Sequence, residues 1–176
     1  RNAAVEISGC NILKNGTVEF KNNTILFSWP RNKELQDMGY GYRYMTKIDS
    51  YLDGNIIGLT TAGLDRTHVD TPSIKESERV TTIENSIFFL NKKADLVIPG
   101  GNTPLKVSAK DFEDVTQLAK VSGNKVVSDP AVFEGAINEA YLKGFQDNTT
   151  YANRYPFEEA LKLFGAVEEY GAQVIR

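Results

Sequence analysis

The first hundred residues alternate short β-type segments with tight-turn residues, and this pattern constrains the fold more than any other feature. Asn15-Gly16 divides one such pair of segments, and Asn-Gly accepts the positive φ angles of a two-residue hairpin turn. Asn22-Asn23 follows within a few residues and divides the next pair. The sequence therefore predicts a meander of three antiparallel strands between about Cys10 and Ser28.

Three tyrosines at alternate positions, Tyr40, Tyr42 and Tyr44, predict a strand in which the rings share one face. Such a stripe offers an aromatic contact surface, or alternatively lines one face of a sheet. Asp53-Gly54-Asn55 predicts a further hairpin turn, and the runs 80–90 and 94–99 are rich in β-forming residues.

The pattern changes near Ser108, where apolar residues begin to recur at helical spacing. Three helices are expected: one after Ser108, one from Ser128-Asp129-Pro130 to about Gly144, and one from Pro156 to Gly171. The last of these has its predicted buried stripe at Phe157, Ala160, Leu161, Phe164 and Val167.

The expected fold class is therefore α+β. An antiparallel, hairpin-rich sheet, either a sandwich or a partial barrel, occupies residues 1–104, and about three α-helices in 105–176 pack on it. The 176 residues suit a single domain, and the apolar residues just before Arg176 leave open a fragment of a longer chain.

Charge and apolar content indicate which classes of partner are unfavourable for this chain. The 20 basic residues are outnumbered by 23 acidic ones, and a net charge of −3 does not favour nucleic acid. No apolar run is long enough to cross a bilayer as a helix, so a soluble protein is expected, in a compartment that the sequence does not indicate.

Residues for catalysis or metal binding are scarce. His68 is the sole histidine and Cys10 the sole cysteine, which is too few for a zinc site. A histidine-activated nucleophile would have to be built around His68, whose flanking carboxylates can orient an imidazole, and the alternative is a solvated loop histidine. Asp49 to Thr60 resembles a calcium loop in its first residues, but Tyr51 and Thr60 occupy ligand positions. We therefore expect no metal, no cofactor and no catalytic residues.

The segment Pro99-Gly100-Gly101-Asn102-Thr103-Pro104 follows a predicted strand, and paired glycines let backbone amides approach an anion. It resembles the Gly-Gly-x-Thr-Pro turn of the phosphogluconolactonase and glucosamine-phosphate isomerase group over about ten residues. That resemblance implies a sugar-phosphate site at Gly100, Gly101, Asn102 and Thr103. A tight turn without a ligand explains the same residues.

Two functions follow as hypotheses. The first is a non-enzymatic structural or interaction subunit, a homo- or hetero-oligomer, for example in a virus particle or surface appendage, with the tyrosine stripe as a contact surface. The second is an enzyme or binding module for a sugar or phosphorylated small molecule that uses the Gly100-Gly101 turn.

Overall fold

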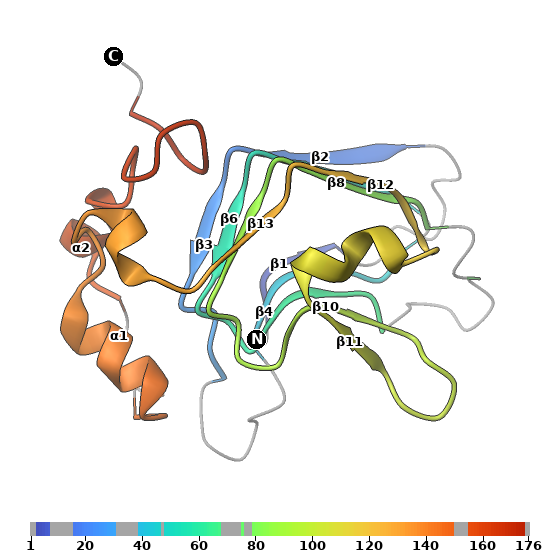
Figure 1. Cartoon of the computed structure of the whole chain (residues 1–176), viewed down its shortest axis with the longest axis horizontal. Helices are drawn as coiled ribbons and strands as arrows, with labels where there is room; N and C mark the ends of the chain where they lie inside the picture. Colours follow the sequence, from blue (N-terminus) through green and yellow to red (C-terminus); the bar gives the residue numbers. More distant parts are fainter. Residues whose placement is uncertain are drawn as a thin grey trace.

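The computed structural model describes residues 3–7, 16–30, 39–46, 48–67, 75, 79–149 and 155–174. Its strands form three sheets (Figure 1). Sheet A contains β1 (Ala3–Ile7), β4 (Tyr40–Tyr44), β7 (Ala62–Asp65), β10 (Ala94–Ile98) and β11 (Leu105–Val107). Sheet B contains β2 (Thr17–Lys21), β5 (Asp49–Asp53), β8 (Thr81–Glu84) and β12 (Leu118–Ser122). Sheet C contains β3 (Thr24–Leu26), β6 (Ile56–Gly58), β9 (Ile87–Phe89) and β13 (Lys125–Val127).

The order of these strands defines a parallel β-helix. The chain visits sheets A, B and C in turn, and each strand pairs in parallel with its counterpart in the next coil. Viewed as in Figure 1, the three sheets outline a triangle, with successive coils stacked on one another. Neighbouring coils bury each other's backbone groups and apolar faces, as expected of a solenoid.

The predicted antiparallel, hairpin-rich sheet is therefore wrong. Among the described strands only β10 and β11 pair antiparallel. Both strands and helices are present, as predicted, but strands continue past residue 104 to Val127. The predicted hairpin at Asn15-Gly16 lies largely outside the described residues, and Asn22-Asn23 and Asp53-Gly54-Asn55 are corners between sheets B and C.

A repeated two-residue corner joins sheet B to sheet C in every coil. Its first residue has a positive φ angle, and the four are Asn22 at 52°, Gly54 at 65°, Asn85 at 45° and Gly123 at 64°. Asparagine and glycine tolerate this left-handed conformation better than other residues. In a hairpin, the two strands on either side of the turn pair with each other. Here the strands on either side of the corner lie in different sheets, so the same turn residues build a β-helix.

The second corner residue forms a ladder of hydrogen bonds along the β-helix. The Asn55 Oδ1 accepts from the main-chain N–H of Asn23 (2.9 Å), and the Asn55 N–H donates to the Ser86 hydroxyl (3.2 Å). The Ser86 N–H donates in turn to Asn124 Oδ1 (3.0 Å). Asn55 also donates to the carbonyl of Phe20 (2.8 Å). Each side chain thus satisfies main-chain groups that the corner removes from the sheets.

Apolar residues stack inside the β-helix in rows set by the strand register. One row in sheet B runs through Phe20, Leu52, Ile83 and Val121, and a row in sheet C places Ile57 beside Phe88. The 3-10 helix η3 (Ala109–Asp114) lies within the triangular outline of Figure 1 and places Phe112 edge-on to Phe88, with ring centroids 5.1 Å apart. Burying one phenylalanine contributes about 1.5–3 kcal/mol.

The C-terminal helices lie outside the β-helix, beside sheet C (Figure 1). They are the 3-10 helix η4 (Pro130–Phe133), α1 (Glu139–Gln146) and α2 (Phe157–Leu161). Phe133 packs on Phe89 of β9, with ring centroids 4.8 Å apart. Asp129 caps η4 by accepting from the Ala131 N–H (2.9 Å), as Ser-Asp-Pro predicted.

The predicted helices are only partly correct. The helix expected after Ser108 is the short η3 followed by strand β12. Ser108 makes no side-chain cap, and Asp95 of β10 accepts from the Ala109 N–H instead (2.9 Å). The third helix is much shorter than predicted, and three residues of its supposed buried stripe, Phe157, Leu161 and Phe164, are exposed.

Candidate ligand-binding cavities

The three tyrosines of the predicted contact surface do not share an exposed face. Tyr42 and Tyr44 are buried in the interior, their ring centroids 5.9 Å apart. Their hydroxyls contact Ser50 and Thr81 of sheet B. Tyr40 is half-buried and lies under the guanidinium of Arg43, 5.3 Å from the ring centroid. A surface site can therefore use only Tyr40 of the three.

The Gly100–Thr103 turn is the exposed tip of the β10–β11 hairpin. The Thr103 N–H donates to the Gly100 carbonyl (3.1 Å), so that amide closes the turn and does not face a ligand. Gly101 has a φ of 58°, which favours glycine, while a side chain on Gly100 would collide with Leu105. Turn geometry and packing therefore explain both glycines.

A cavity of about 610 Å³ lies beside this hairpin on the outer side of sheet A. We call it the hairpin cavity. It brings Thr103 of the predicted turn site and Tyr40 of the predicted tyrosine surface together with residues of β7, β10 and β11. The remaining lining residues are Ala62, Asp65, Thr67, Lys93, Val97, Pro104, Leu105 and Lys106.

A row of side-chain positions crosses sheet A at this cavity. Strand register aligns Glu6, Arg43, Asp65, Val97 and Lys106 on five successive strands. Arg43 Nε lies 3.1 Å from Asp65 Oδ2 and its Nη1 lies 3.6 Å from Glu6. Asp65 also accepts from the N–H and hydroxyl of Thr67 (3.0 and 2.6 Å). The Asp65 carboxylate is thus well satisfied within the protein.

The pKa values of Tyr40 and Lys93, which line the cavity, are shifted by burial and by neighbouring charges. Burial raises the pKa of Tyr40, with the Asp65 charge adding to the effect, so its phenol stays protonated and can donate a hydrogen bond. Burial lowers the pKa of Lys93, and the positive charge of Lys106 lowers it further. The two ammonium groups therefore repel each other across the cavity.

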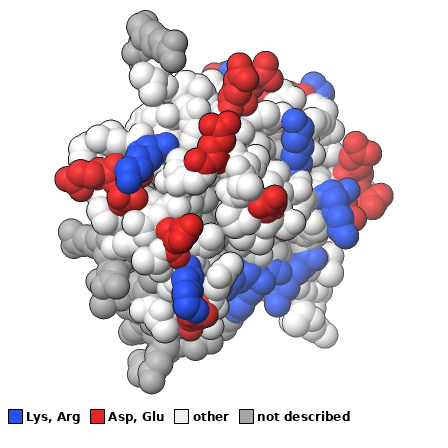
Figure 2. All heavy atoms as spheres, turned by 60° about the vertical axis from the view of Figure 1, so that its left-hand side comes forward, with Lys and Arg blue, Asp and Glu red and all other residues white. Residues whose placement is uncertain are grey.

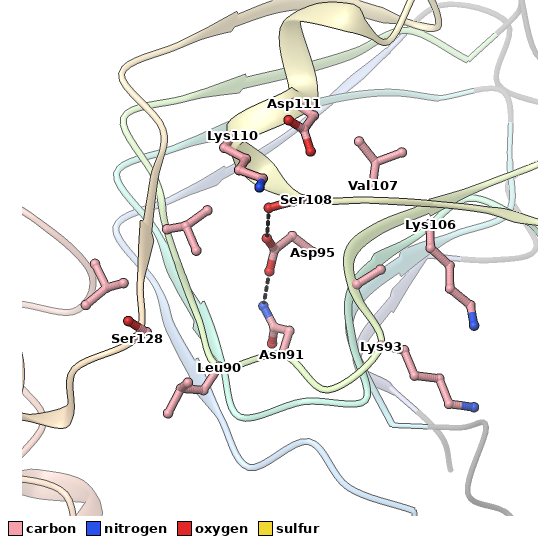
Figure 3. Close-up of a pocket in the computed structure, with 13 residues that line it drawn as sticks. Leu90, Asn91, Lys93, Asp95, Lys106, Val107, Ser108, Lys110, Asp111 and Ser128 are labelled. Atoms are coloured by element: carbon pink, nitrogen blue, oxygen red, sulfur yellow. Dashed lines mark hydrogen bonds between the residues drawn. The ribbon is translucent and has the colours of Figure 1, made fainter.

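A second cavity, of about 520 Å³, lies at the C-terminal end of the β-helix between β10, η3 and β13 (Figure 3). Asp95 lies at its centre, hydrogen bonded to Asn91 Nδ2 (2.9 Å) and the Ser108 hydroxyl (3.4 Å). Because the Asp95 carboxylate also caps η3, it serves the structure of this end. Figure 3 shows that Lys93 and Lys106 extend away from Asp95 on the same side.

Metal binding, the lone histidine and cysteine, and membrane crossing are the remaining features considered from the sequence. Within those ranges no group of three or more His, Cys, Asp and Glu side chains is placed to hold a metal ion. His68 and Cys10 lie outside the described residues. No helix among the described residues is long and apolar enough to cross a membrane.

Comparison with protein families, curated proteins and solved structures finds no match for this chain. The site must therefore be judged by its own geometry. Sequence reasoning missed Arg43, Asp65, Lys93 and Lys106, which carry the charge in and beside the hairpin cavity. Parallel register aligns Arg43 with Asp65, and the repeated corner residues were the signal for that register. Lys106 is brought to the cavity by the antiparallel pairing of β10 and β11, and Lys93 directly precedes β10.

Proposed function

We propose that this chain is a non-enzymatic interaction subunit that binds a protein partner through its C-terminal segment. The supporting observation is an apolar stripe formed by Phe157, Leu161, Phe164 and Val174, which are 71%, 51%, 44% and 62% exposed. Exposed apolar patches of this kind mark interaction sites on soluble domains. An aromatic and aliphatic stripe also suits the buried centre of an interface.

The four side chains belong to one local surface. Phe157, Leu161 and Phe164 follow one another at spacings of four and three residues, which places them along one side of a helical segment. The Gly165 N–H donates to the Ala172 carbonyl (2.7 Å), so Val174 is held beside the residue that follows Phe164. The stripe is therefore continuous from α2 into the last described residues.

This segment is already attached to the β-helix through a different set of residues. Leu163 is buried in the cluster against sheet C, and Val167 and Tyr170 pack on that cluster. At its end, the Gly171 N–H donates to the Gly54 carbonyl (2.6 Å). The segment therefore carries two apolar sides, one used within the chain and one left for a partner.

Charge around the stripe indicates the chemistry of that partner. Residues 155–174 contain Glu158, Glu159, Glu168 and Glu169 against a single lysine, Lys162. Lys162 Nζ lies 2.8 Å from Glu159 Oε1. Figure 2, which brings the helical side forward, shows acidic side chains in several groups on this face, with basic ones among them. A second copy would place acid against acid, so we propose a basic amphipathic helix as partner.

Two synthetic helices test this function. Both carry the same leucine stripe, flanked by lysines in one and by glutamates in the other, and their binding to the full chain is followed by fluorescence anisotropy. We expect saturable binding of the lysine form and at least tenfold weaker binding of the glutamate form. The double variant Phe157→Ser, Leu161→Ser should weaken binding of the lysine form at least tenfold.

Val126→Ser is the matched control, because Val126 is exposed to a similar extent and lines the cavity of Figure 3. It should bind the lysine form as the parent does. Equal binding of both peptides, or unchanged binding by the double variant, would overturn the proposal. So would a stable dimer in light scattering that the double variant abolishes, because the stripe would then bind a second copy.

A second function, binding of a sugar or phosphorylated small molecule, is favoured by the hairpin cavity beside the Gly100–Thr103 turn. In this function the turn supplies part of the cavity wall through Thr103, and its amides do not bind the ligand as the sequence had suggested. Membership of a virus particle or surface appendage stays a prediction.

A further inference from the structure

The three sheets stop at different levels at the C-terminal end of the β-helix. Among the described strands sheet A has five, because β11 pairs antiparallel with β10 and extends the sheet by one strand. Sheets B and C have four each, and β12 and β13 are their last described strands. β11 therefore occupies a fifth level of sheet A, and the matching level of sheets B and C begins at the edges of β12 and β13.

The inward-facing rows of sheets B and C end at this level in apolar side chains that the protein covers only in part. In sheet C, strand register aligns Ile57, Phe88 and Val126. Ile57 and Phe88 are both 0% exposed, whereas Val126 is 48% exposed. In sheet B, Ile83 is fully buried and Val121, the next residue of its row, is half-buried. The apolar interior therefore continues to an accessible end.

Two cavities lie beside η3 at this end. The larger, of about 520 Å³, is lined by Val126 of β13, Val107 of β11 and the start of η3 (Figure 3). The smaller, of about 100 Å³, is lined by Val121 of β12, Asn124 of the corner and residues of η3. Figure 1 places η3 inside the triangular outline and the C-terminal helices outside it. The two cavities follow the last strands around their corner, so they suit the inward side chains of one further strand–corner–strand unit.

The corner ladder has a direction that indicates how such a unit would bind. In each coil the main-chain N–H of the second corner residue donates to the side-chain oxygen of the equivalent residue in the next coil. These residues are, in order, Asn23, Asn55, Ser86 and Asn124. By this repeat the Asn124 N–H points to the fifth level. The Lys125 N–H donates to the Ser86 carbonyl (2.9 Å), so the N–H and carbonyl of Val126 point the other way, because successive residues of a strand alternate.

We infer that this end of the β-helix binds an extended segment of a partner protein, which adds a parallel strand to β12, turns at the same corner and adds a parallel strand to β13. The second corner residue of the segment is asparagine or serine, whose side-chain oxygen accepts from the Asn124 N–H. Its apolar side chains cover Val121 and Val126. In strand addition, main-chain hydrogen bonds supply affinity and side-chain pockets supply specificity.

A segment suits this end better than a whole second copy of the chain. A second copy stacked in register would need the fifth level of sheet A for its own β1, and β11 already lies there. A strand–corner–strand segment uses only sheets B and C. The inferred surface goes beyond the proposed function and is independent of the apolar stripe on α2.

The probe is a synthetic peptide with the sequence of residues 80–90, which contains β8, the corner with Ser86, and β9. We expect saturable binding of this peptide to the full chain in fluorescence anisotropy and slower hydrogen exchange at the Val126 amide. The same peptide carrying Ile87→Pro keeps the inward side chains but loses the N–H that, within the chain, donates to the Asn55 carbonyl of the preceding coil. It should bind at least tenfold more weakly, because proline cannot donate to a ladder.

Val126→Ser in the full chain should weaken binding of the 80–90 peptide at least fivefold. Leu105→Ser is the matched control, because Leu105 is 51% exposed on β11 and lines the hairpin cavity, and it should leave the affinity unchanged. The Phe157→Ser, Leu161→Ser variant should also bind this peptide as the parent does. A failure of strand addition is therefore distinct from a failure of the stripe on α2.

Three results would overturn the inference: no saturation below about 1 mM, equal binding of the proline peptide, or unchanged affinity in Val126→Ser. Self-association of the parent in light scattering that Val126→Ser abolishes would overturn it too, because a second copy would then occupy these edges.

Discussion

Arg66 and Arg79 each donate a hydrogen bond to the main-chain carbonyl of the other. Arg66 Nη2 lies 2.8 Å from the Arg79 oxygen, and Arg79 Nη2 lies 2.7 Å from the Arg66 oxygen. Both guanidinium groups are buried over the ring of Tyr44, 5.7 and 5.5 Å from its centroid. Since Arg66 follows β7 and Arg79 precedes β8, the pair ties together two chain segments where sheet A meets sheet B.

We predict that Arg66→Met lowers the free energy of unfolding by about 2–4 kcal/mol, because it leaves the carbonyls of Arg79 and Gln117 without their donor. Arg66→Lys should lose most of the same stability, since an ammonium cannot reproduce the two-pronged geometry. Urea denaturation measures both. Lys110→Met, at an exposed position of η3, is the control and should stay within about 0.5 kcal/mol. If Arg66→Met also stays within about 0.5 kcal/mol of the parent, the hydrogen bonds that Arg66 donates do not stabilise the fold.

Asn55 provides the second prediction, at the centre of the corner ladder. Asn55→Ala removes the acceptor for the Asn23 N–H and the donor for the Phe20 carbonyl, both in a buried corner. We expect a loss of about 2–4 kcal/mol. Hydrogen exchange should show the Asn23 amide losing protection first. Asn102→Ala, at the exposed hairpin tip, should change stability by less than about 0.5 kcal/mol.

The same corner shows why the fold class was mispredicted. Asn22-Asn23 and Gly54-Asn55 carry the residues of a two-residue hairpin turn, and local sequence does not distinguish a reversal from a corner. The distinguishing signal is long-range: ladder partners lie 32, 31 and 38 residues apart, from Asn23 through Asn55 and Ser86 to Asn124. Such a period indicates a solenoid. Individual strands such as 40–44 and 94–98 were predictable because β-propensity is local.

Helical spacing misled in another way. Phe112, Val115 and Leu118 are all buried, as their helical spacing predicted, but they do not lie on one α-helix. Phe112 lies on η3, Val115 directly follows it, and Leu118 begins β12. The sequence correctly placed a helix at Phe157–Leu161, but its predicted length and the burial of its apolar side were wrong. A sequence pattern shows an apolar side without showing what covers it. The lysines of the hairpin cavity carried no local pattern at all.

Glu84 provides a prediction about pH on the outer face of sheet B. Lys120 Nζ lies 2.5 Å from its carboxylate, and the hydroxyls of Ser122 and Tyr51 donate to it (2.8 and 3.1 Å). Lys120 first, and then Ser122, hold the pKa of Glu84 below its usual range. The unfolded chain therefore binds this proton at a higher pH than the folded protein does. The stability that Glu84 contributes is complete above its ordinary pKa and is lost as pH falls through the lowered value.

Glu84→Gln should accordingly be less stable than the parent at about pH 7, and the difference should shrink at about pH 3. Urea midpoints at the two pH values measure this. Glu113→Gln, at an exposed position of η3, should show no such convergence. A Glu84→Gln deficit that stays constant with pH would mean that the contacts of Glu84 do not depend on its charge.

Lys92 provides the last prediction, because it joins the β-helix to the C-terminal helices. Its Nζ donates to the Phe145 carbonyl (2.5 Å) and to Asn148, at the C-terminal end of α1, where the helix dipole favours a cation. It also lies 4.0 Å from the ring centroid of Trp29. Burial lowers the pKa of Lys92, which shows that its charge is partly withdrawn from water.

Lys92→Met should therefore cost about 1–3 kcal/mol and loosen α1 while leaving the coils of the β-helix protected. Hydrogen exchange distinguishes the two, because amides of α1 should lose protection and those of β5 and β8 should not. Lys143→Met is the matched control: Lys143 lies on α1 itself, but its partner Asp147 is an exposed neighbour one turn away, worth less than about 1 kcal/mol. If the two variants expose α1 equally, the attachment rests on the apolar contacts of Phe145 and Leu163 with sheet C and not on Lys92.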